Sequence, residues 1–241
     1  MLRILITLLL LAMSVLAKPT PATNCDLSSA TLVLPSNQTV LVEPQGPPSF
    51  IAVAFGVQNY TCNATSLTYS NIGAVGELFD ISCLYGKDEF SSIQDHLYNA
   101  WNETPANITI QDLISVVGDK PQVLGQHYYV PDPKPTAGGP AISPKWDFTS
   151  DSERGKPDAF VIAASVGTLP APNSTDNINW VQLKNIEGEL ADSVYRVDTK
   201  GGQPPTSCTA GAPLLSVKYA AKYCESRIRA VQAFADHLLF F

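Results

Sequence analysis

The stretch Phe50-Ile51-Ala52-Val53-Ala54-Phe55-Gly56-Val57 carries the strongest secondary-structure signal in the chain. Large apolar side chains occupy every second position from Ile51 to Val57, and alanine or glycine occupies the positions between them. Successive side chains of a β-strand point to opposite faces, so this alternation predicts a strand. We expect its large face to meet the core and its small face to allow a close neighbour.

Other apolar runs of similar length follow, separated by turn residues. The chain has 19 prolines and 15 glycines among 241 residues, and only 15% of its residues are charged. We expect further strands at residues 31–34, 39–42, 74–81, 114–117, 123–130, 160–166, 178–183, 193–198 and 215–219. Many short strands with frequent turns predict an all-β, single-domain fold, either a β-sandwich or a jelly-roll-like barrel.

Two segments have helical rather than strand periodicity. After a cap at Ser91 or Ser92, the residues Ile93, Leu97 and Trp101 fall on one stripe, which predicts a short helical insertion. Residues 225–239 show a similar spacing and predict a C-terminal helix. Residues 131–144 contain five prolines and predict a long surface loop.

The N-terminus has the features of a secretory signal peptide. One positive charge at Arg3 precedes an apolar run from Ile4 to Met13, and Val15-Leu16-Ala17 supplies small residues for cleavage. The run is shorter than the roughly 20 residues that span a bilayer, so no stable membrane anchor is expected. We expect a signal peptide at 1–17, a leader at 18–24 and a secreted protein, at the cell wall or free outside the cell.

The chain contains sequons for N-glycosylation at Asn37, Asn59, Asn63, Asn102, Asn107 and Asn173. We expect glycans at Asn37, Asn102, Asn107 and Asn173. Asn59 lies within an apolar strand pattern, where a buried face would exclude a sugar.

Five cysteines agree with an oxidising compartment, in which four of them are expected to pair. Four cysteines allow three connectivities, and the sequence does not select one. Our preferred pairs are Cys62 with Cys83, across a short hairpin, and Cys25 with Cys208, which leaves Cys224 unpaired. The three histidines are scattered and no CxxC motif is present, so no metal site is expected.

Charge and motifs exclude several classes of function. The formal net charge is −7, which disfavours nucleic acid as a partner. The sequence has no GxSxG, HExxH or P-loop motif, and Gly73-Ala74-Val75-Gly76 is one glycine short of a dinucleotide-binding fingerprint. We expect no cofactor.

A set of polar and aromatic residues interrupts the apolar strands. His127 and Asp147 are candidates for an acid–base pair, provided that they share a cleft. Candidates for ligand binding, which for a sugar require aromatic faces beside hydrogen-bonding groups, are Gln58, Tyr60, Tyr128, Trp146, Arg196 and Lys200. Each also has a structural interpretation: Trp146 as a core anchor, and Arg196 as the partner of Asp198 in a salt bridge.

The order of several segments resembles a secreted family called domain of unknown function 3455, found in fungi and bacteria. The resemblance covers residues 25–223 and rests on Gly56-Val57-Gln58-Asn59-Tyr60-Thr61-Cys62, Gly73 to Asp80, Gly125 to Tyr128, Trp146 to Phe148, Asn179 to Leu183 and Tyr195 to Gly202. It implies no established activity. Fungal members often carry the label malate dehydrogenase, which this sequence does not support because it lacks the nucleotide-binding turn.

The sequence departs from the family pattern at its end. Residues 224–241 continue as a basic and then apolar tail that ends in Leu238-Leu239-Phe240-Phe241. A misjudged splice site in the gene model would explain both this tail and the unpaired Cys224, and a docking helix is the alternative.

Together these features predict a secreted glycoprotein that binds carbohydrate or a cell-wall polymer without catalysis. The alternative is an extracellular enzyme that acts on glycans or small acids. An NAD-dependent malate dehydrogenase is the interpretation that the sequence favours least.

Overall fold

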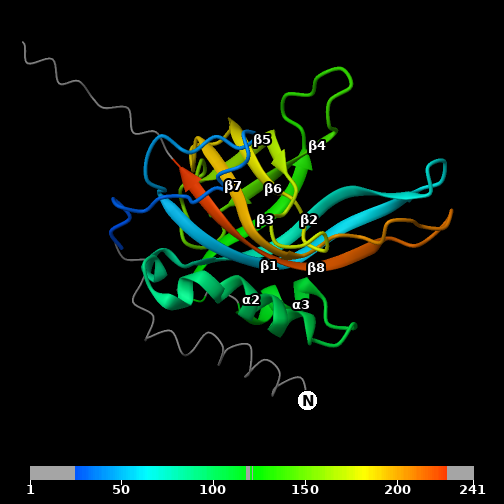
Figure 1. Ribbon diagram of the computed structural model, residues 1–241, viewed down its shortest axis with the longest axis horizontal. Coiled ribbons are helices and arrows are strands. Elements are labelled where there is room, and N and C mark those ends of the chain that lie inside the picture. The colour runs from blue at the N-terminus through cyan, green and yellow to red at the C-terminus, as the bar shows by residue number, and fades with distance from the viewer. Residues whose placement is uncertain (1–24, 118–119, 121, 227–241) are drawn as a thin grey trace, which may run out of the picture.

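The computed structural model describes residues 25–117, 120 and 122–226. Eight antiparallel strands follow one another around a closed barrel, and the last pairs with the first (Figure 1). The strands are β1 (Phe50–Asn63), β2 (Thr68–Asp80), β3 (Val123–Pro131), β4 (Ile142–Asp147), β5 (Phe160–Leu169), β6 (Trp180–Glu187), β7 (Ser193–Gly201) and β8 (Leu215–Ser226). A short 3-10 helix η1 (Ser82–Leu84) and the α-helices α2 (Asp88–Asn102) and α3 (Ile110–Val117) lie between β2 and β3.

The all-β class is confirmed, but the architecture is a closed barrel and not a sandwich. In a sandwich, two sheets would face each other across the core; here β1 pairs along its length with both β2 and β8. Alternating strand patterns are common to both architectures, because each buries one face of every strand. The pattern therefore could not distinguish them.

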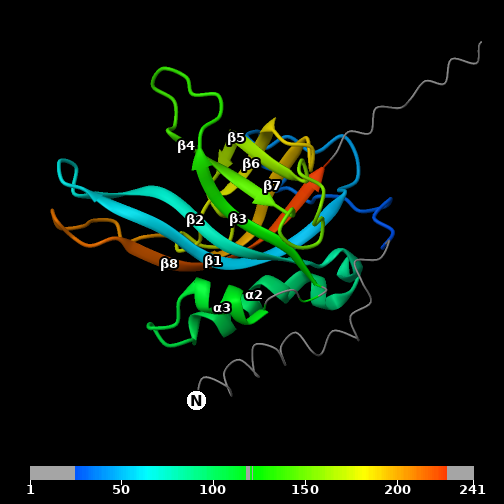
Figure 2. The same ribbon diagram turned by 180° about the vertical axis from the view of Figure 1, so that it is seen from behind.

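The strand β1 separates two cores. Its small residues Ala52 and Ala54 face the barrel interior, together with Trp146 and Tyr223. Its large face packs on the outside against a cluster that includes Trp101 of α2. Figures 1 and 2 show both helices on the same side of the barrel, where α2 packs against the outer face of β1 and β8 and α3 contacts β2. As expected, the large residues of β1 pack in a core, and its small residues allow a close approach on the other face.

Several expected elements differ in the structure. Residues 31–34 and 39–42 are not strands, and residues 114–117 belong to α3. The start of α3 is fixed by a reciprocal cap, in which Asp112 N donates to Thr109 Oγ1 at 3.1 Å and Thr109 N donates to Asp112 Oδ2 at 2.8 Å. The proline-rich loop is shorter than expected, because β4 begins at Ile142. The helical insertion is confirmed by α2.

All four expected cysteines form disulfides, but in a different pairing. Cys25 bonds to Cys83 and Cys62 bonds to Cys208, with Cα–Cα distances of 5.1 and 5.8 Å. Cys62 and Cys83 lie at opposite ends of β2, whose 13 residues span roughly 40 Å. The preferred pairing was therefore wrong, because the hairpin is too long for its two cysteines to meet. Cys224 is free and buried.

The strand β8 continues to Ser226, so Cys224, Glu225 and Ser226 belong to the barrel and not to a C-terminal helix. The expected signal peptide and leader, at 1–17 and 18–24, lie outside the described residues, as does the remainder of the expected helix. The turn between β1 and β2 and the loop between β7 and β8 project together beyond the barrel (Figure 1). We call this end of the barrel the hairpin end.

Candidate functional site

Most of the candidate residues meet on the inner wall of the barrel. The strand register places His127 beside Trp146, and Arg196 beside Tyr223. We define the inner-wall cluster as Gln58, Tyr60, His127, Trp146, Arg196, Tyr219 and Tyr223. Four of the six residues predicted to bind a ligand, and one of the two predicted for catalysis, belong to it.

His127 is enclosed at the middle of this cluster. Its side chain is only 1% exposed and stacks on Trp146, with 4.5 Å between ring centroids. Its Nδ1 lies 2.9 Å from the carbonyl oxygen of Lys145, so Nδ1 carries the proton and donates. Burial lowers the pKa of His127 to about 3. The ring is therefore neutral at physiological pH.

Arg196 brings a positive charge to the inner wall beside Tyr223. Its side chain is half-buried, and Nε and Nη2 donate to the carbonyl oxygen of Asn179 at 3.2 and 2.9 Å. Among the described residues, no carboxylate lies within ion-pair distance of the guanidinium group. The expected pair with Asp198 is not formed, because Asp198 binds Lys222 at 2.9 Å.

Two buried donors of the cluster have no partner. The amide oxygen of Gln58 accepts from Asn71 Nδ2 at 3.1 Å, but Gln58 Nε2 has no partner. The indole Nε1 of Trp146 has none either. Gln58 is 2% exposed and Trp146 is 1% exposed. The hydroxyl group of Tyr60, by contrast, has a hydrogen-bond partner, since it donates to the carbonyl oxygen of Gly202 at 2.7 Å.

Asp147 lies on the outer face of the barrel, away from His127. Its Oδ2 accepts from Tyr128 Oη at 2.6 Å and pairs with Lys145 Nζ at 2.8 Å. Burial alone would raise the pKa of Asp147, but hydrogen bonds from Lys145, Thr149 and Tyr128 outweigh it and lower the pKa to about 2. His127 and Asp147 therefore share no cleft, and the expected acid–base pair is not formed. Tyr128 belongs to this outer group.

Lys200 is also on the outside, where it pairs with Asp95 of α2 at 2.6 Å. It joins the helix to β7 and takes no part in the inner-wall cluster. This position reflects the irregular pairing between Val197 and Lys200, which shifts the register of β7 against β8.

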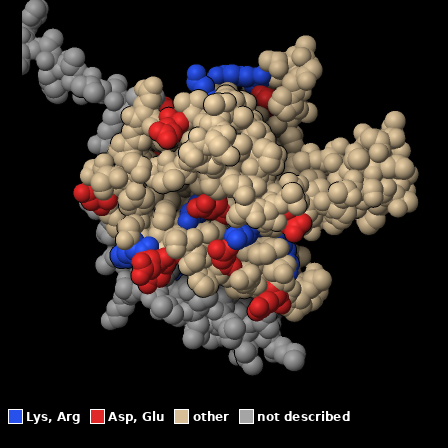
Figure 3. Space-filling view, viewed as in Figure 1, with Lys and Arg blue, Asp and Glu red and all other residues tan. Residues whose placement is uncertain are grey.

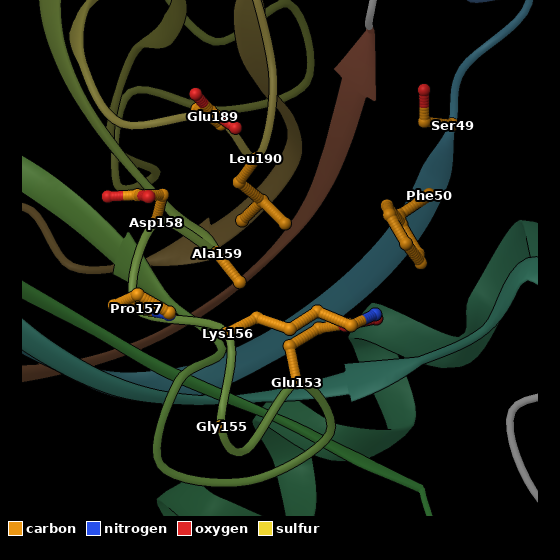
Figure 4. A pocket seen from close by; sticks show the side chains of 10 residues that line it. All are labelled: Ser49, Phe50, Glu153, Gly155, Lys156, Pro157, Asp158, Ala159, Glu189 and Leu190. Carbon is orange, nitrogen blue, oxygen red and sulfur yellow. The ribbon is translucent and has the colours of Figure 1, made fainter.

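A pocket of about 660 Å³ opens at the other end of the barrel. We call it the mouth pocket. It is lined by Ser49, Phe50, Glu153, Gly155, Lys156, Pro157, Asp158, Ala159, Glu189 and Leu190. Figure 4 shows the carboxylates of Asp158 and Glu189 on the opposite side of the pocket from Phe50. Lys156 forms an ion pair with Glu153.

Local geometry holds together the two loops that carry the carboxylates of the mouth pocket. Glu189 N donates to the carbonyl oxygen of Asp158 at 2.9 Å. The preceding Gly188 has a φ of +95°, and a Cβ there would lie 2.1 Å from the carbonyl oxygen of Phe160. Only glycine fits this turn. Our sequence reasoning missed the pocket, because its residues come from three loops that only the closed barrel brings together.

The predicted glycosylation sites are accessible. The side chains of Asn37, Asn102, Asn107 and Asn173 are all exposed. Asn59 is partly buried and accepts a hydrogen bond from Ser216 Oγ at 2.7 Å. Across the described part of the chain, no group of three or more potential ligands could hold a metal ion.

A family model for "Protein of unknown function (DUF3455)" matches residues 44–224. The chain belongs to the DUF3455 family. No curated protein and no solved structure matches it. In this DUF3455 protein the match covers the barrel from just before β1 to within three residues of the end of β8. The segment that the family model matches is therefore the barrel with its two helices.

The glycine segment Gly73 to Gly76 of the DUF3455 barrel lies inside β2. A dinucleotide-binding fingerprint requires a turn from a parallel strand into a helix, whereas β2 is antiparallel to both neighbours. Gly76 instead faces Tyr219, whose hydroxyl would lie 3.1 Å from an added Cβ. The segment is therefore a packing feature. No helix in the described residues is long and apolar enough to cross a membrane.

Proposed function

We propose that this DUF3455 protein is a secreted, non-catalytic glycoprotein that binds a carbohydrate or a cell-wall polymer in the mouth pocket. The observation that carries the proposal is the pocket itself, which combines an aromatic and aliphatic wall with carboxylates on the facing side. Its volume of about 660 Å³ lies within the ordinary range of ligand sites.

The chemistry of the pocket fits a neutral sugar. The ring of Phe50 offers an apolar surface to the C–H face of a pyranose, and Leu190 and Pro157 add apolar groups elsewhere in the lining of the pocket. Asp158 and Glu189 offer acceptors for sugar hydroxyl groups. With Lys156 paired to Glu153, these two carboxylates give the pocket a negative charge, which disfavours small organic acids.

Several features support export from the cell and a binding role. Two disulfides are typical of oxidising compartments, and the four favoured sequons are exposed. The separation of His127 from Asp147 removes the acid–base pair on which the enzymatic alternative depended. On the face seen in Figure 3, acidic and basic groups are interspersed, and the described residues there form no cationic patch for nucleic acid.

The test is a binding panel of immobilised wall polysaccharides, probed with the glycosylated wild-type protein and three variants. We expect at least one neutral polysaccharide to bind wild type, and Phe50→Leu and Glu189→Gln each to weaken that binding by about tenfold. Glu103→Gln, which removes an exposed carboxylate at the end of α2, is the matched control and should bind as wild type does.

Two results would contradict the proposal. One is the absence of binding above background across the whole panel. The other is polysaccharide binding that is unchanged by both pocket variants, since the sugar would then sit elsewhere on the molecule.

A further inference from the structure

The residues that line the mouth pocket carry an excess of negative charge. Glu153, Asp158 and Glu189 are acidic, and Lys156 is the one basic residue of the lining. Lys156 pairs with Glu153. Within the described part of the chain, no ion pair reaches the carboxylate of Asp158 or that of Glu189. The pocket therefore presents two carboxylates that the protein does not neutralise.

The backbone fixes the segments that carry these two carboxylates. Glu189 N donates to the carbonyl oxygen of Asp158 at 2.9 Å, and Leu190 N donates to that of Phe160 at 3.0 Å. These two hydrogen bonds hold the turn before β7 against the loop before β5. Negative charges on adjacent segments repel each other, and a bound cation relieves that repulsion. The carboxylate side of the pocket thus favours a cationic group on the ligand.

The aromatic side of the pocket has an acidic neighbour. Glu225 of β8 is paired with Phe50 of β1, so both side chains face the barrel interior. Ser49 N, on the same rim, donates to the carbonyl oxygen of Glu225 at 2.7 Å. The Glu225 side chain is fully buried, and neither of its carboxyl oxygens has a partner. The residue paired with Phe50 is therefore an acid, and it brings no base to this side of the pocket.

We propose that, among sugars, the mouth pocket selects those that carry a protonated amino group, such as glucosamine units. The inference rests on the proposed function, because the sugar ring must also pack on Phe50. An ammonium group gains ion pairs with Asp158 and Glu189, whereas a hydroxyl or N-acetyl group at the same carbon gains only hydrogen bonds. Figure 4 shows these carboxylates across the pocket from Phe50, so an oligosaccharide can contact both sides at once.

The test compares two tetrasaccharides of the same ring and linkage, the β-1,4-linked tetramers of glucosamine and of N-acetylglucosamine. Titration calorimetry with the glycosylated wild-type protein measures both affinities at about pH 5.5, where the carboxylates are ionised and the amines are protonated. We expect the glucosamine tetramer to bind about tenfold more tightly. Added sodium chloride should reduce this preference and leave the affinity for the N-acetylated tetramer unchanged.

Variants that remove the carboxylates should remove the preference. Asp158→Asn and Glu189→Gln should each reduce the ratio of the two affinities by about threefold, and the double variant should bind both tetramers alike. A second double variant, with Glu103→Gln and Asp176→Asn, has the same net charge and keeps both pocket carboxylates. Both of its positions are exposed, and it should retain the wild-type preference.

A gain of affinity tests the same charges without relying on a loss of binding. Lys156→Gln releases Glu153 from its ion pair and leaves three carboxylates of the lining without a cation. We expect this variant to bind the glucosamine tetramer about threefold more tightly and the N-acetylated tetramer as wild type does. Lys134→Gln, at an exposed position between β3 and β4, removes the same charge elsewhere and should change neither affinity.

The inference is overturned if the two tetramers bind wild type alike, if neither binds, or if the preference survives the pocket double variant. It is also overturned if tetralysine, which has amines and no sugar ring, binds as tightly as the glucosamine tetramer, because the pocket would then select charge alone. Phe50→Leu should weaken both tetramers. Equal binding of the two tetramers that is still weakened by Phe50→Leu would remove the amine preference and leave the proposed function standing.

Discussion

The side chain of Glu225 is completely buried, and neither of its carboxyl oxygens has a hydrogen-bond partner. Burial raises its pKa to about 8, well above the value near 4.5 for an unfolded chain. The folded protein therefore holds a proton that the unfolded chain has released. Between pH 4.5 and pH 8 this difference lowers the free energy of unfolding as pH rises, and below pH 4.5 the penalty is absent.

We predict that Glu225→Gln removes this part of the pH dependence. The variant and wild type should have similar free energies of unfolding near pH 4.5, and the variant should gain about 1.4 kcal/mol relative to wild type for each pH unit toward pH 8. Urea unfolding at several pH values measures the difference. Glu187→Gln, at an exposed position, should follow the wild-type curve. A constant offset between Glu225→Gln and wild type at all pH values would contradict the prediction.

Individual residues also show where sequence reasoning reached its limit. The sequence identified Gln58, His127 and Arg196 as unusual polar residues within apolar strands, and all three do lie on the inner wall. It could not tell that Asp147 faces outward. Which face a side chain takes depends on the register, and bulges such as the one between Leu78 and Phe79 change the register without a clear mark in the sequence.

Among the structural elements, α2 is held to the barrel in part by Lys218 of β8. Lys218 Nζ donates to the carbonyl oxygens of Trp101 and Thr104 at 3.0 and 2.8 Å, and to Thr104 Oγ1 at 2.8 Å. These carbonyls belong to the C-terminal end of the helix, where a positive charge is favoured. The ammonium group also lies 4.3 Å from the centre of the Trp101 ring.

We predict that Lys218→Met lowers the free energy of unfolding by about 1–3 kcal/mol, because it removes the donor to the Thr104 carbonyl and one of several donors to the Trp101 carbonyl. Thermal and urea unfolding followed by tryptophan fluorescence measure this loss. Lys184→Met, at an exposed position of β6, should change stability by less than about 0.5 kcal/mol. Equal effects of the two substitutions would show that Lys218 does not cap the helix.

The elements differ in how far local sequence determined them. The alternation in β1 and the apolar stripe of α2 were strong enough to predict both. For α3, the branched side chains of Ile114, Val116 and Val117 predict a strand at residues 114–117, and the structure has a helix there. The signal that decides this segment is the reciprocal cap of Thr109 and Asp112, which lies upstream of the apolar run.

At the level of the whole molecule, the two disulfides close loops of different size. Cys62 and Cys208 are separated by 146 residues, and Cys25 and Cys83 by 58. In the chain-entropy model, a longer loop restricts the unfolded chain more. The Cys62–Cys208 bond also joins the two segments that project at the hairpin end, where Cys208 N donates to the carbonyl oxygen of Leu67 at 2.8 Å.

We predict that the variant with serine at positions 62 and 208 loses more stability than the variant with serine at 25 and 83. Each loss should lie between about 2 and 5 kcal/mol, with a difference of roughly 1 kcal/mol or less. Urea unfolding of both variants under non-reducing conditions measures it. A larger loss on removal of the Cys25–Cys83 bond would contradict the chain-entropy account.

Global features were the hardest to predict. The pairing of the cysteines and the choice between sandwich and barrel depend on contacts between residues far apart in the chain, such as β1 with β8. The alternation of apolar and polar residues within one segment does not predict such contacts. The mouth pocket shares this dependence, because its walls come from the start of β1, the loop before β5 and the turn before β7.

The ring of eight strands has one more consequence. An open sheet ends in two rows of unsatisfied amide and carbonyl groups, which can recruit strands from other molecules and seed fibrils. Closing the ring pairs these rows with each other. This barrel can therefore persist at high concentration without adding strands from its neighbours.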